Sequence, residues 1–283
     1  MVVIVTDSSV DLPPAEAERL GIVVAPLSVA FSDENLHDRG LSRAEFYRRL
    51  EAAPRPPLVS GAAAEAFAAA FRQAQPRGEI VCMVMSVESS FTYVAAEVAV
   101  REVPGLAISI INTGRSLAAQ AAIAIAAAEA AQAGAERAAV VSLIEEISSA
   151  ADTYLAPATT EYLRRADRLT TLGQGPAGRL DGAIPVLRVR GRLTAVAKAP
   201  DAETARRQML ELAVKAVSPG EEQIAIVTHA VAPEAAAAVA EQLAERLRCR
   251  PPLITELGPT VGALLGPGTV GIGFCPSRAA AGS

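Results

Sequence analysis

The sequence predicts an α/β protein with two domains: an N-terminal doubly wound parallel sheet, then an α/β domain with a mixed sheet. The chain has 283 residues, which exceeds one typical domain and suits two. Hydrophobic residues make up 51% of it and charged residues 20%, which is enough apolar material for large cores. Short apolar runs alternate with helical patterns, as in repeated βαβ units.

The N-terminal domain is expected to span residues 1–152. Its first strand, residues 2–5, ends at a polar turn, and Pro13 and Pro14 then open a short helix, where proline is tolerated. Ser42 and Glu45 have the spacing of a capping box at the start of a second helix. Further strands are expected at residues 22–29, 79–85 and 106–111, and further helices from Ser60, Thr92, Arg115 and Ala135 onward.

The second domain is expected to span residues 153–283, where the regular alternation of strands and helices changes. Two strand patterns, at residues 184–189 and 193–198, are separated by Arg-Gly-Arg, which is typical of a hairpin. Residues 258–268 are rich in glycine and are expected to form a loop. The remaining expected elements are strands at 223–228, 253–256 and 269–274, and helices at 160–166, 201–217 and 233–247.

Composition excludes several classes of function. The formal charge of -5 leaves no basic surface for nucleic acid. Three scattered cysteines are too few for a disulfide framework or a zinc site. The chain starts with an apolar strand that no basic region precedes, unlike a signal peptide. Residues 117–133 form the most apolar long stretch, but its glutamine and glutamate side chains favour a buried helix over an integral membrane segment. We therefore expect a cytoplasmic protein.

Hydroxyl side chains gather where a strand pattern gives way to a helix pattern. The apolar run 80–85 is followed by Ser86, Ser89, Ser90 and Thr92, and the last of these begins a helix. Ligands of open α/β sheets bind at such strand ends, and the first turn of a helix suits an anion. Serine and threonine are also ordinary N-caps, so a purely structural role is the alternative.

Two further residues could join these hydroxyls in one site. Ser60 is expected to open a helix of its own, and Arg168 could reach the site from the second domain. Neutral donors with one arginine suit a carboxylate or a phosphate.

Other motifs carry little chemistry. Residues 173–178 match Gly-x-Gly-x-x-Gly, but they follow a poor strand pattern, contain proline and lack an acidic residue at the ribose-binding distance. The two histidines, His37 and His229, have no spacing that suggests a catalytic arrangement. No cofactor and no metal are predicted.

The order of motifs resembles that of the DegV family of fatty-acid-binding proteins, from Val2 to Phe274. The opening Val-Thr-Asp-Ser-Ser-Val-Asp-Leu-Pro is similar to the family's N-terminal signature. Ser-Ser-Phe-Thr-Tyr stands where the family has Leu-Ser-Gly-Thr-Tyr. The motifs that carry the resemblance lie at residues 5–13, 41–47, 57–60, 89–93, 161–169 and 258–274.

The resemblance implies two α/β domains with a long-chain fatty acid between them, and no catalysis by this chain. It implies that the carboxylate is bound at Ser60, Ser90, Thr92 and Arg168, with the two serines donating hydrogen bonds at helix N-termini. Some members of the family are binding subunits that present the carboxylate to a separate fatty acid kinase subunit.

The sequence departs from the family at several site positions. Val59 replaces a threonine, Phe91 replaces a glycine, and Leu264 stands where a histidine is expected. Ala166 and Asp167 replace a pair of glycines. One alternative is therefore a degenerate member whose pocket is collapsed or is filled by Phe91, Leu264 and Leu265.

A second alternative belongs to a different class of function. It is an enzyme acting on a small phosphorylated or carbonyl compound, similar to dihydroxyacetone kinases. These use a histidine to hold substrate, and only His37 or His229 could serve that purpose here.

Overall fold

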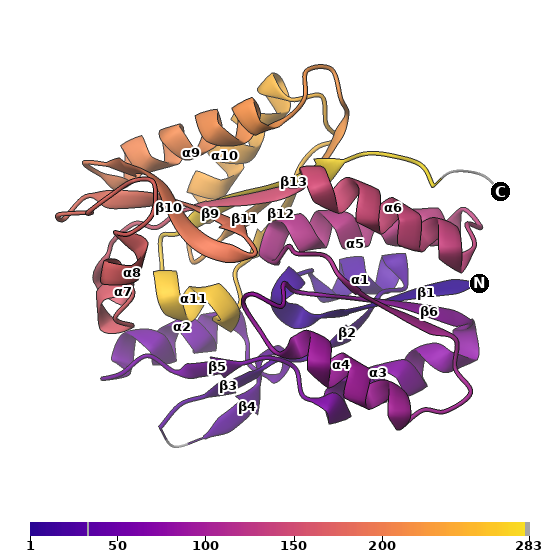
Figure 1. Ribbon diagram of the computed structural model, residues 1–283. Coiled ribbons are helices and arrows are strands. Elements are labelled where there is room, and N and C mark those ends of the chain that lie inside the picture. The colour runs from indigo at the N-terminus through magenta and orange to yellow at the C-terminus, as the bar shows by residue number, and fades with distance from the viewer. Residues whose placement is uncertain (33, 281–283) are drawn as a thin grey trace.

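The most apolar helix of the chain lies between two β-sheets (Figure 1). The computed structural model describes residues 1–32 and 34–280. Helix α5 (Leu117–Gln132) has 14 of its 16 residues buried, as expected of a helix that is apolar on every side. Its small side chains allow close packing: a Cβ atom at Gly273 would lie 2.4 Å from the backbone carbon of Ala118. The prediction of a buried helix is confirmed.

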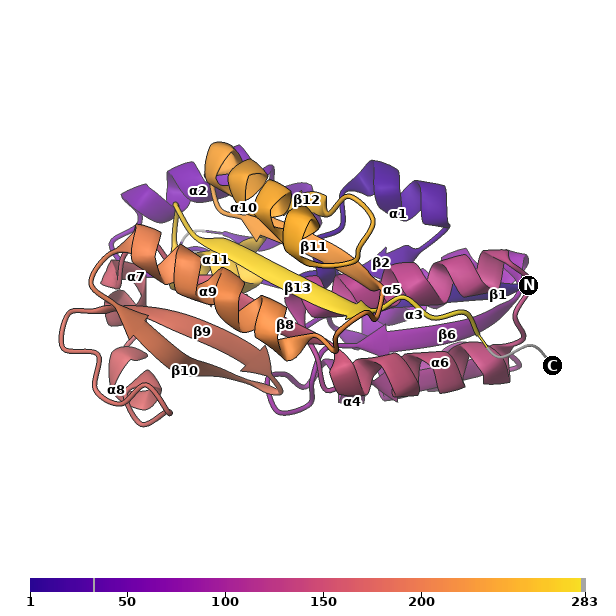
Figure 2. The same cartoon turned by 90° about the horizontal axis from the view of Figure 1, so that it is seen from above.

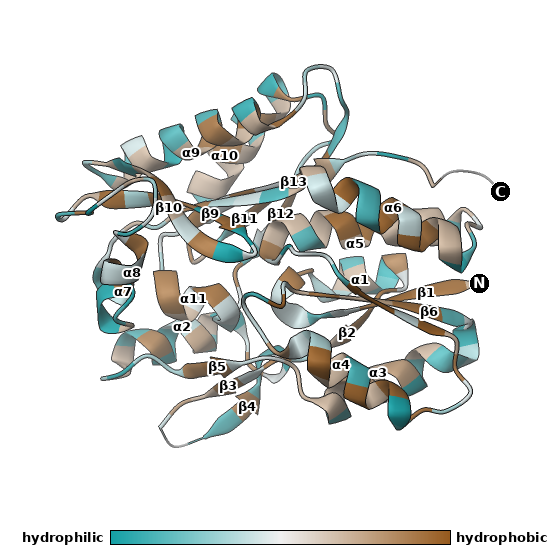
Figure 3. Cartoon of the chain, in the orientation of Figure 1, coloured by the Kyte–Doolittle hydropathy of each residue, from teal (hydrophilic) through white to brown (hydrophobic). Residues whose placement is uncertain are grey.

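The first sheet has four parallel strands, and its helices cover both faces. The strand order is β2 (Val23–Ala25), β1 (Val2–Asp7), β6 (Glu79–Val84), β7 (Ile108–Asn112). One face packs against α1 (Pro14–Leu20), α5 and α6 (Arg137–Ala150), and the other against α3 (Ala64–Ala74) and α4 (Thr92–Arg101). Figure 3 shows β1 and β6 as mostly hydrophobic, whereas α3 and α4 carry polar residues among their apolar ones. The doubly wound parallel sheet is therefore confirmed.

A small antiparallel sheet, which the sequence did not predict, lies beside the first one. Its strand order is β4 (Asn35–His37), β3 (Ser28–Ala30), β5 (Leu58–Ser60). Residues 22–29 were expected to form one strand, but they are divided between β2 and β3 on either side of Pro26. Ser60 was expected to open a helix. It is instead the last residue of β5, and helix α3 begins four residues later, at Ala64.

The capping prediction at Ser42 holds. Helix α2 (Arg43–Ala52) follows this residue, whose Oγ accepts the Glu45 N–H at 3.2 Å. The described residues of this part of the chain also form the short 3-10 helices η1 (Ser8–Val10), η2 (Asp38–Gly40) and η3 (Gln75–Arg77).

The second sheet has six strands and is mixed, as predicted. Its order is β10 (Arg192–Ala199), β9 (Ile184–Arg190), β8 (Asp152–Ala156), β13 (Val270–Pro276), β11 (Gln223–His229), β12 (Leu253–Glu256). The pair β11–β12 is parallel and the other pairs are antiparallel. Helices α9 (Ala202–Ala216) and α10 (Pro233–Arg246) cover one face (Figure 2). The other face packs on α5 and on the core shared with the first sheet.

Three elements of the second half, β8, α11 and α8, were not predicted from the sequence. Strand β8 was missed because it directly follows α6 without a turn signal. Residues 258–268 were expected to form a loop but contain α11 (Pro259–Leu265), and this helix packs on α2, β5 and α7 (Glu161–Arg165). The short α8 (Leu169–Leu172) follows α7. In the part of the chain that the structure describes, no helix has the length and apolarity needed to cross a membrane.

Candidate functional site

The strand order of the first sheet marks where a ligand site is expected. After β1 the chain adds its next strand, β2, on one side of the sheet, and after β6 it adds β7 on the opposite side. The topological switch point therefore lies between β1 and β6. Asp7, at the end of β1, is buried there and its carboxylate accepts the Met85 N–H at 2.9 Å. Burial raises the pKa of this carboxyl. The contact fixes the start of the loop that carries the predicted hydroxyls.

The predicted residues Ser90 and Thr92 form a hydrogen-bonded pair. Their side-chain oxygens are 2.6 Å apart, and the Thr92 N–H donates to Ser90 Oγ at 3.2 Å. Thr92 is fully buried as the first residue of α4. Gly61 lies directly against this pair: a Cβ atom there would be 2.5 Å from Thr92 Oγ1 and 2.6 Å from Ser90 Oγ. The end of β5, with Ser60, is therefore in contact with the N-terminus of α4.

Ser60, Ser90 and Arg168 line one cavity of about 270 Å³, which we call the serine cavity. Ser89 and Ser116 are the other two serines of its lining, and the sequence had not singled out Ser116. Thr92 does not line this cavity, but its hydroxyl is hydrogen-bonded to that of Ser90, which does. The apolar lining consists of Leu27, Val59, Met85, Leu117, Val189, Leu193, Val261 and Leu264. The structure thus brings together three of the four predicted residues, from both halves of the chain.

A second cavity of about 590 Å³ adjoins the first. Leu58, Pro56, Pro57 and Leu172 give it apolar walls, and Glu88 and Arg192 lie at its polar part. Six residues line both cavities: Val59, Ser89, Arg168, Leu193, Thr260 and Leu264. The two cavities therefore offer one elongated space, with hydroxyl groups concentrated in the smaller part.

Arg168 is the cation of the serine cavity. It lies just before α8 and is exposed. Its guanidinium makes no hydrogen bond or ion pair with any residue in ranges 1–32 and 34–280. It is therefore available to an anionic ligand, to which an arginine can donate two hydrogen bonds.

The tip of the β9–β10 hairpin joins the loops that carry the serines. Ser89 Oγ donates to the Gly191 carbonyl, and the Gly191 N–H donates to the Gly114 carbonyl at 3.1 Å. Arg192 pairs with Glu88 at 3.2 Å. The loop after β6 and the loop after β7 are thus both held by the second sheet.

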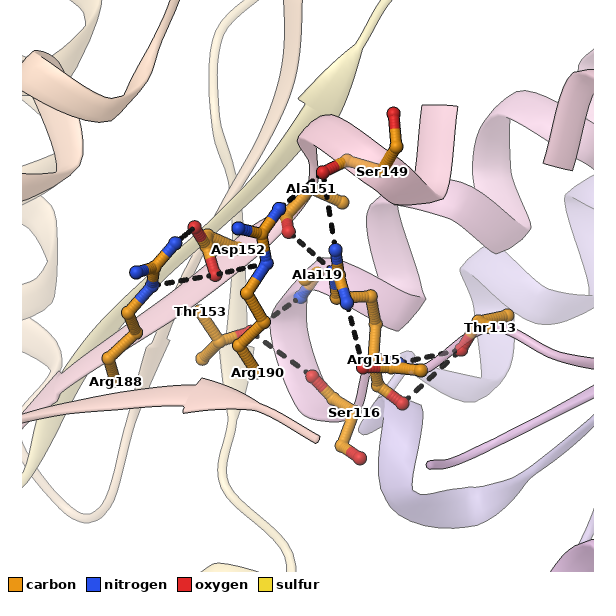
Figure 4. Close-up of polar contacts among 11 residues, drawn as sticks. Thr113, Arg115, Ser116, Ala119, Ser149, Ala151, Asp152, Thr153, Arg188 and Arg190 are labelled. Carbon is orange, nitrogen blue, oxygen red and sulfur yellow. Dashed lines mark hydrogen bonds and ion pairs between the residues drawn. The ribbon is translucent and has the colours of Figure 1, made fainter. Parts of the chain in front are cut away.

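A polar network continues this junction between the two sheets (Figure 4). The Arg115 side chain donates to the carbonyls of Ala151, at 2.7 Å, and Ser149, at 3.2 Å. Arg188 makes a two-pronged ion pair with the buried Asp152. Burial, followed by the neighbouring Arg190, lowers the pKa of Arg115. These contacts anchor the chain where it passes from the first sheet to the second.

Two hydroxyls near the site lack a partner, and sequence reasoning missed both. Ser116 Oγ and Thr260 Oγ1 are buried atoms without a hydrogen bond to any described residue. Both residues line the serine cavity. Ser116 precedes a long alanine-rich helix, and Thr260 lies in a glycine-rich segment, so the first resembles an ordinary cap and the second a loop residue.

The substituted family positions do not close the space. Phe91 is 88% exposed and lines neither cavity. Leu265 is fully buried in the core, whereas Val59 and Leu264 form walls of both cavities. Of the three residues named for a filled pocket, only Leu264 lines the cavities.

The histidines stand apart from the site. Neither His37 nor His229 lines either cavity. His229 is the last residue of β11, and its Nδ1 atom accepts the Ala232 N–H at 3.3 Å in the turn that follows. Burial lowers the pKa of this histidine. Among the described residues, no cluster of histidine, cysteine and carboxylate side chains could hold a metal ion.

Comparison with known proteins identifies the family. A family model described as "Uncharacterised protein, DegV family" matches residues 1–277. The chain belongs to the DegV family. A DegV domain-containing protein of Streptomyces coelicolor is 33% identical to it over 281 residues, covering 96% of this chain and 97% of that one.

Solved DegV structures share its fold. A DegV family protein from Thermus thermophilus, described as fatty acid binding, has a TM-score of 0.85 and 26% identity, covering 97% of this chain and 99% of its own. DegV from Bacillus subtilis, described as a fatty acid binding protein, has a TM-score of 0.84 and 24% identity, with coverage of 97% and 99%. The arrangement of a parallel four-stranded sheet and a mixed six-stranded sheet is therefore that of DegV proteins.

Proposed function

We propose that this DegV protein binds a long-chain fatty acid without catalysing a reaction. The ligand lies between the domains that we assign to residues 1–152 and 153–283. The observation that carries the proposal is the meeting of Ser60, Ser90 and Arg168 in one cavity next to a larger, partly apolar one. The fatty acid binding described for the Thermus thermophilus relative supports it.

The carboxylate belongs in the serine cavity. Ser60 and Ser90 supply hydroxyl donors, Thr92 orients Ser90 at the positive end of α4, and Arg168 supplies charge. The acyl chain passes Val59, Leu193 and Leu264, which line both cavities, into the larger space. Apolar walls with a few placed polar groups are typical of small-molecule sites.

The lining of the serine cavity favours binding over chemistry. It contains no histidine, cysteine, aspartate or glutamate among the residues that the structure describes. The serine cavity itself therefore supplies no such general acid or base, and Glu88 of the adjoining cavity is paired with Arg192. This argues against the enzyme alternative in which a histidine holds the substrate.

The same geometry suits presentation of the ligand to a fatty acid kinase subunit. Ser60 and Arg168 are both exposed, so a partner could reach the head group from solvent. The rate at which a purified fatty acid kinase subunit transfers the γ-phosphoryl group of ATP to oleate, releasing ADP, tests that role when it is measured with and without this protein. Equal rates in both reactions would remove it.

Native mass spectrometry of the purified protein tests the binding function. A stoichiometric fatty acid, identified after solvent extraction, is the expected result, and oleate added to ligand-free protein should restore the same mass. A ligand-free mass that oleate and palmitate leave unchanged would overturn the proposed function.

A further inference from the structure

Ser116 is placed as a helix cap but does not act as one. It immediately precedes α5, the longest described helix, and its side chain makes no capping hydrogen bond. Thr153 of β8 has taken over that task, since its Oγ1 accepts the Ala119 N–H at 2.9 Å and donates to the Ser116 carbonyl at 3.1 Å. Figure 4 shows the Ser116 hydroxyl pointing away from this network.

The free hydroxyl is buried at the wall of the serine cavity. Ser116 is 2% exposed, and its Oγ is without a partner in the described chain. Leaving a buried hydroxyl without a hydrogen bond is unfavourable, so such a group in a native site indicates a missing partner. The cavity supplies the place for that partner, because Ser116 and Leu117 both line it.

The surroundings of Ser116 favour an anion. The first N–H groups of α5 have no acceptor within the helix, and the helix is 16 residues long, so its N-terminus carries a positive partial charge. The N-terminus of α4 reaches the same cavity through Ser90. Two positive helix ends and no carboxylate side chain therefore meet in this cavity.

We propose that Ser116, at the N-terminus of α5, is a further head-group residue that donates a hydrogen bond to a bound carboxylate. The inference rests on the proposed function and deepens it, because it assigns the cavity to a carboxylic acid over an alcohol or an ester of the same length. A carboxylate has about four acceptor positions. Ser60, Ser90, Ser116 and Arg168 all line one cavity and can donate to these positions.

Calorimetric titration of the full chain with oleate, below its micellar concentration, tests this assignment. Ser116→Ala should raise the Kd by roughly tenfold to a hundredfold, as expected for one hydrogen bond to a charged group. Ser148→Ala is the matched control, because Ser148 Oγ is also buried without a partner but lies on α6, outside both cavities. The control should bind oleate within about twofold of the wild type, a difference of only about 0.4 kcal/mol.

A neutral ligand separates head-group recognition from packing. Oleyl alcohol has the same chain as oleate but no charge, so Ser116→Ala should weaken its binding less than that of oleate. If Ser116→Ala fails to fold, Ser116→Gly replaces it, since glycine is accepted at this helix position.

Each outcome decides between the proposals. Wild-type protein that binds oleate while Ser116→Ala and Ser148→Ala bind it equally well would overturn this inference alone. Equal weakening toward oleate and oleyl alcohol would also overturn it, because packing would then explain the loss. Wild-type protein that binds no fatty acid would overturn the proposed function and this inference together.

Discussion

Replacing Ser90 with alanine should weaken fatty acid binding while leaving the protein folded. Ser90 Oγ accepts the Thr92 N–H at 3.2 Å and lies 2.6 Å from Thr92 Oγ1. When the Thr92 hydroxyl donates to Ser90, the hydrogen of the Ser90 hydroxyl is left for the ligand. The mutation removes this donor from the wall of the serine cavity and changes the first turn of α4.

The size of the effect follows from these contacts. One hydrogen bond to a charged carboxylate contributes about 1.5–3 kcal/mol, which corresponds to a Kd raised roughly tenfold to a hundredfold. The lost contact with the Thr92 N–H resembles the loss of an N-cap, at about 1 kcal/mol of unfolding free energy. In a chain of this size, that lowers the Tm by only about 2–4 °C.

Two measurements separate the effects. Calorimetry gives the Kd for oleate at 25 °C, far below the melting range, and a thermal melt of ligand-free protein gives the change in Tm. Ser148→Ala serves again as a control that removes a buried hydroxyl elsewhere. A Kd within twofold of the wild type would refute the assignment of Ser90, and a collapse of the melt would show that the cap contact had been underestimated.

Three further perturbations test the junction around the cavity. Gly61→Ala should weaken oleate binding at least as much as Ser90→Ala, because its Cβ would approach the Ser90–Thr92 pair to 2.5–2.6 Å; unchanged calorimetry would contradict that packing. Asp152→Ala should lower the unfolding free energy, measured by urea denaturation, by about 3 kcal/mol, because it leaves Arg188 without its buried partner. Arg192→Gln removes the exposed ion pair with Glu88 and should cost below about 1 kcal/mol. Equal losses for the two variants would refute the distinction. Burial raises the pKa of Asp11 from 3.8 to about 7, so the folded state binds this proton more tightly than the unfolded state, and stability falls as the pH rises from 3.8 to about 7. The fall in Tm between pH 5 and pH 8 should therefore be smaller in Asp11→Asn than in the wild type. An equal fall in both proteins would exclude Asp11 as its cause.

Much of the fold could be predicted because its determinants are local. Apolar runs of strand length followed by helical periodicity predicted β1, β6 and β7 and the helices between them. The hairpin of β9 and β10 was predicted from its Arg-Gly-Arg turn, where Gly191 has a φ of 70°. The small sheet β3–β4–β5 was not, because strands of three residues carry too little periodicity to detect.

The candidate site divides in the same way. Ser90 and Thr92 could be proposed because hydroxyls after an apolar strand are a local signal. Arg168 was proposed as a cation that could reach them from the second domain, and the resemblance to the DegV family supported that choice. Ser60 was predicted to open a helix, but it ends a strand, and it lines the serine cavity where Gly61 allows close contact with α4.

What the sequence determined by itself is the class of the fold, the buried nature of α5 and the presence of hydroxyls at strand ends, since each depends on residues close together in the chain. The tertiary structure alone decided which hydroxyls are free. Ser116 has the position of an ordinary cap, and only the approach of Thr153, 37 residues away, takes the capping role from it. Hydrogen-bond partners so distant in sequence are set by the packing of the second sheet on α5, and no local pattern records that packing.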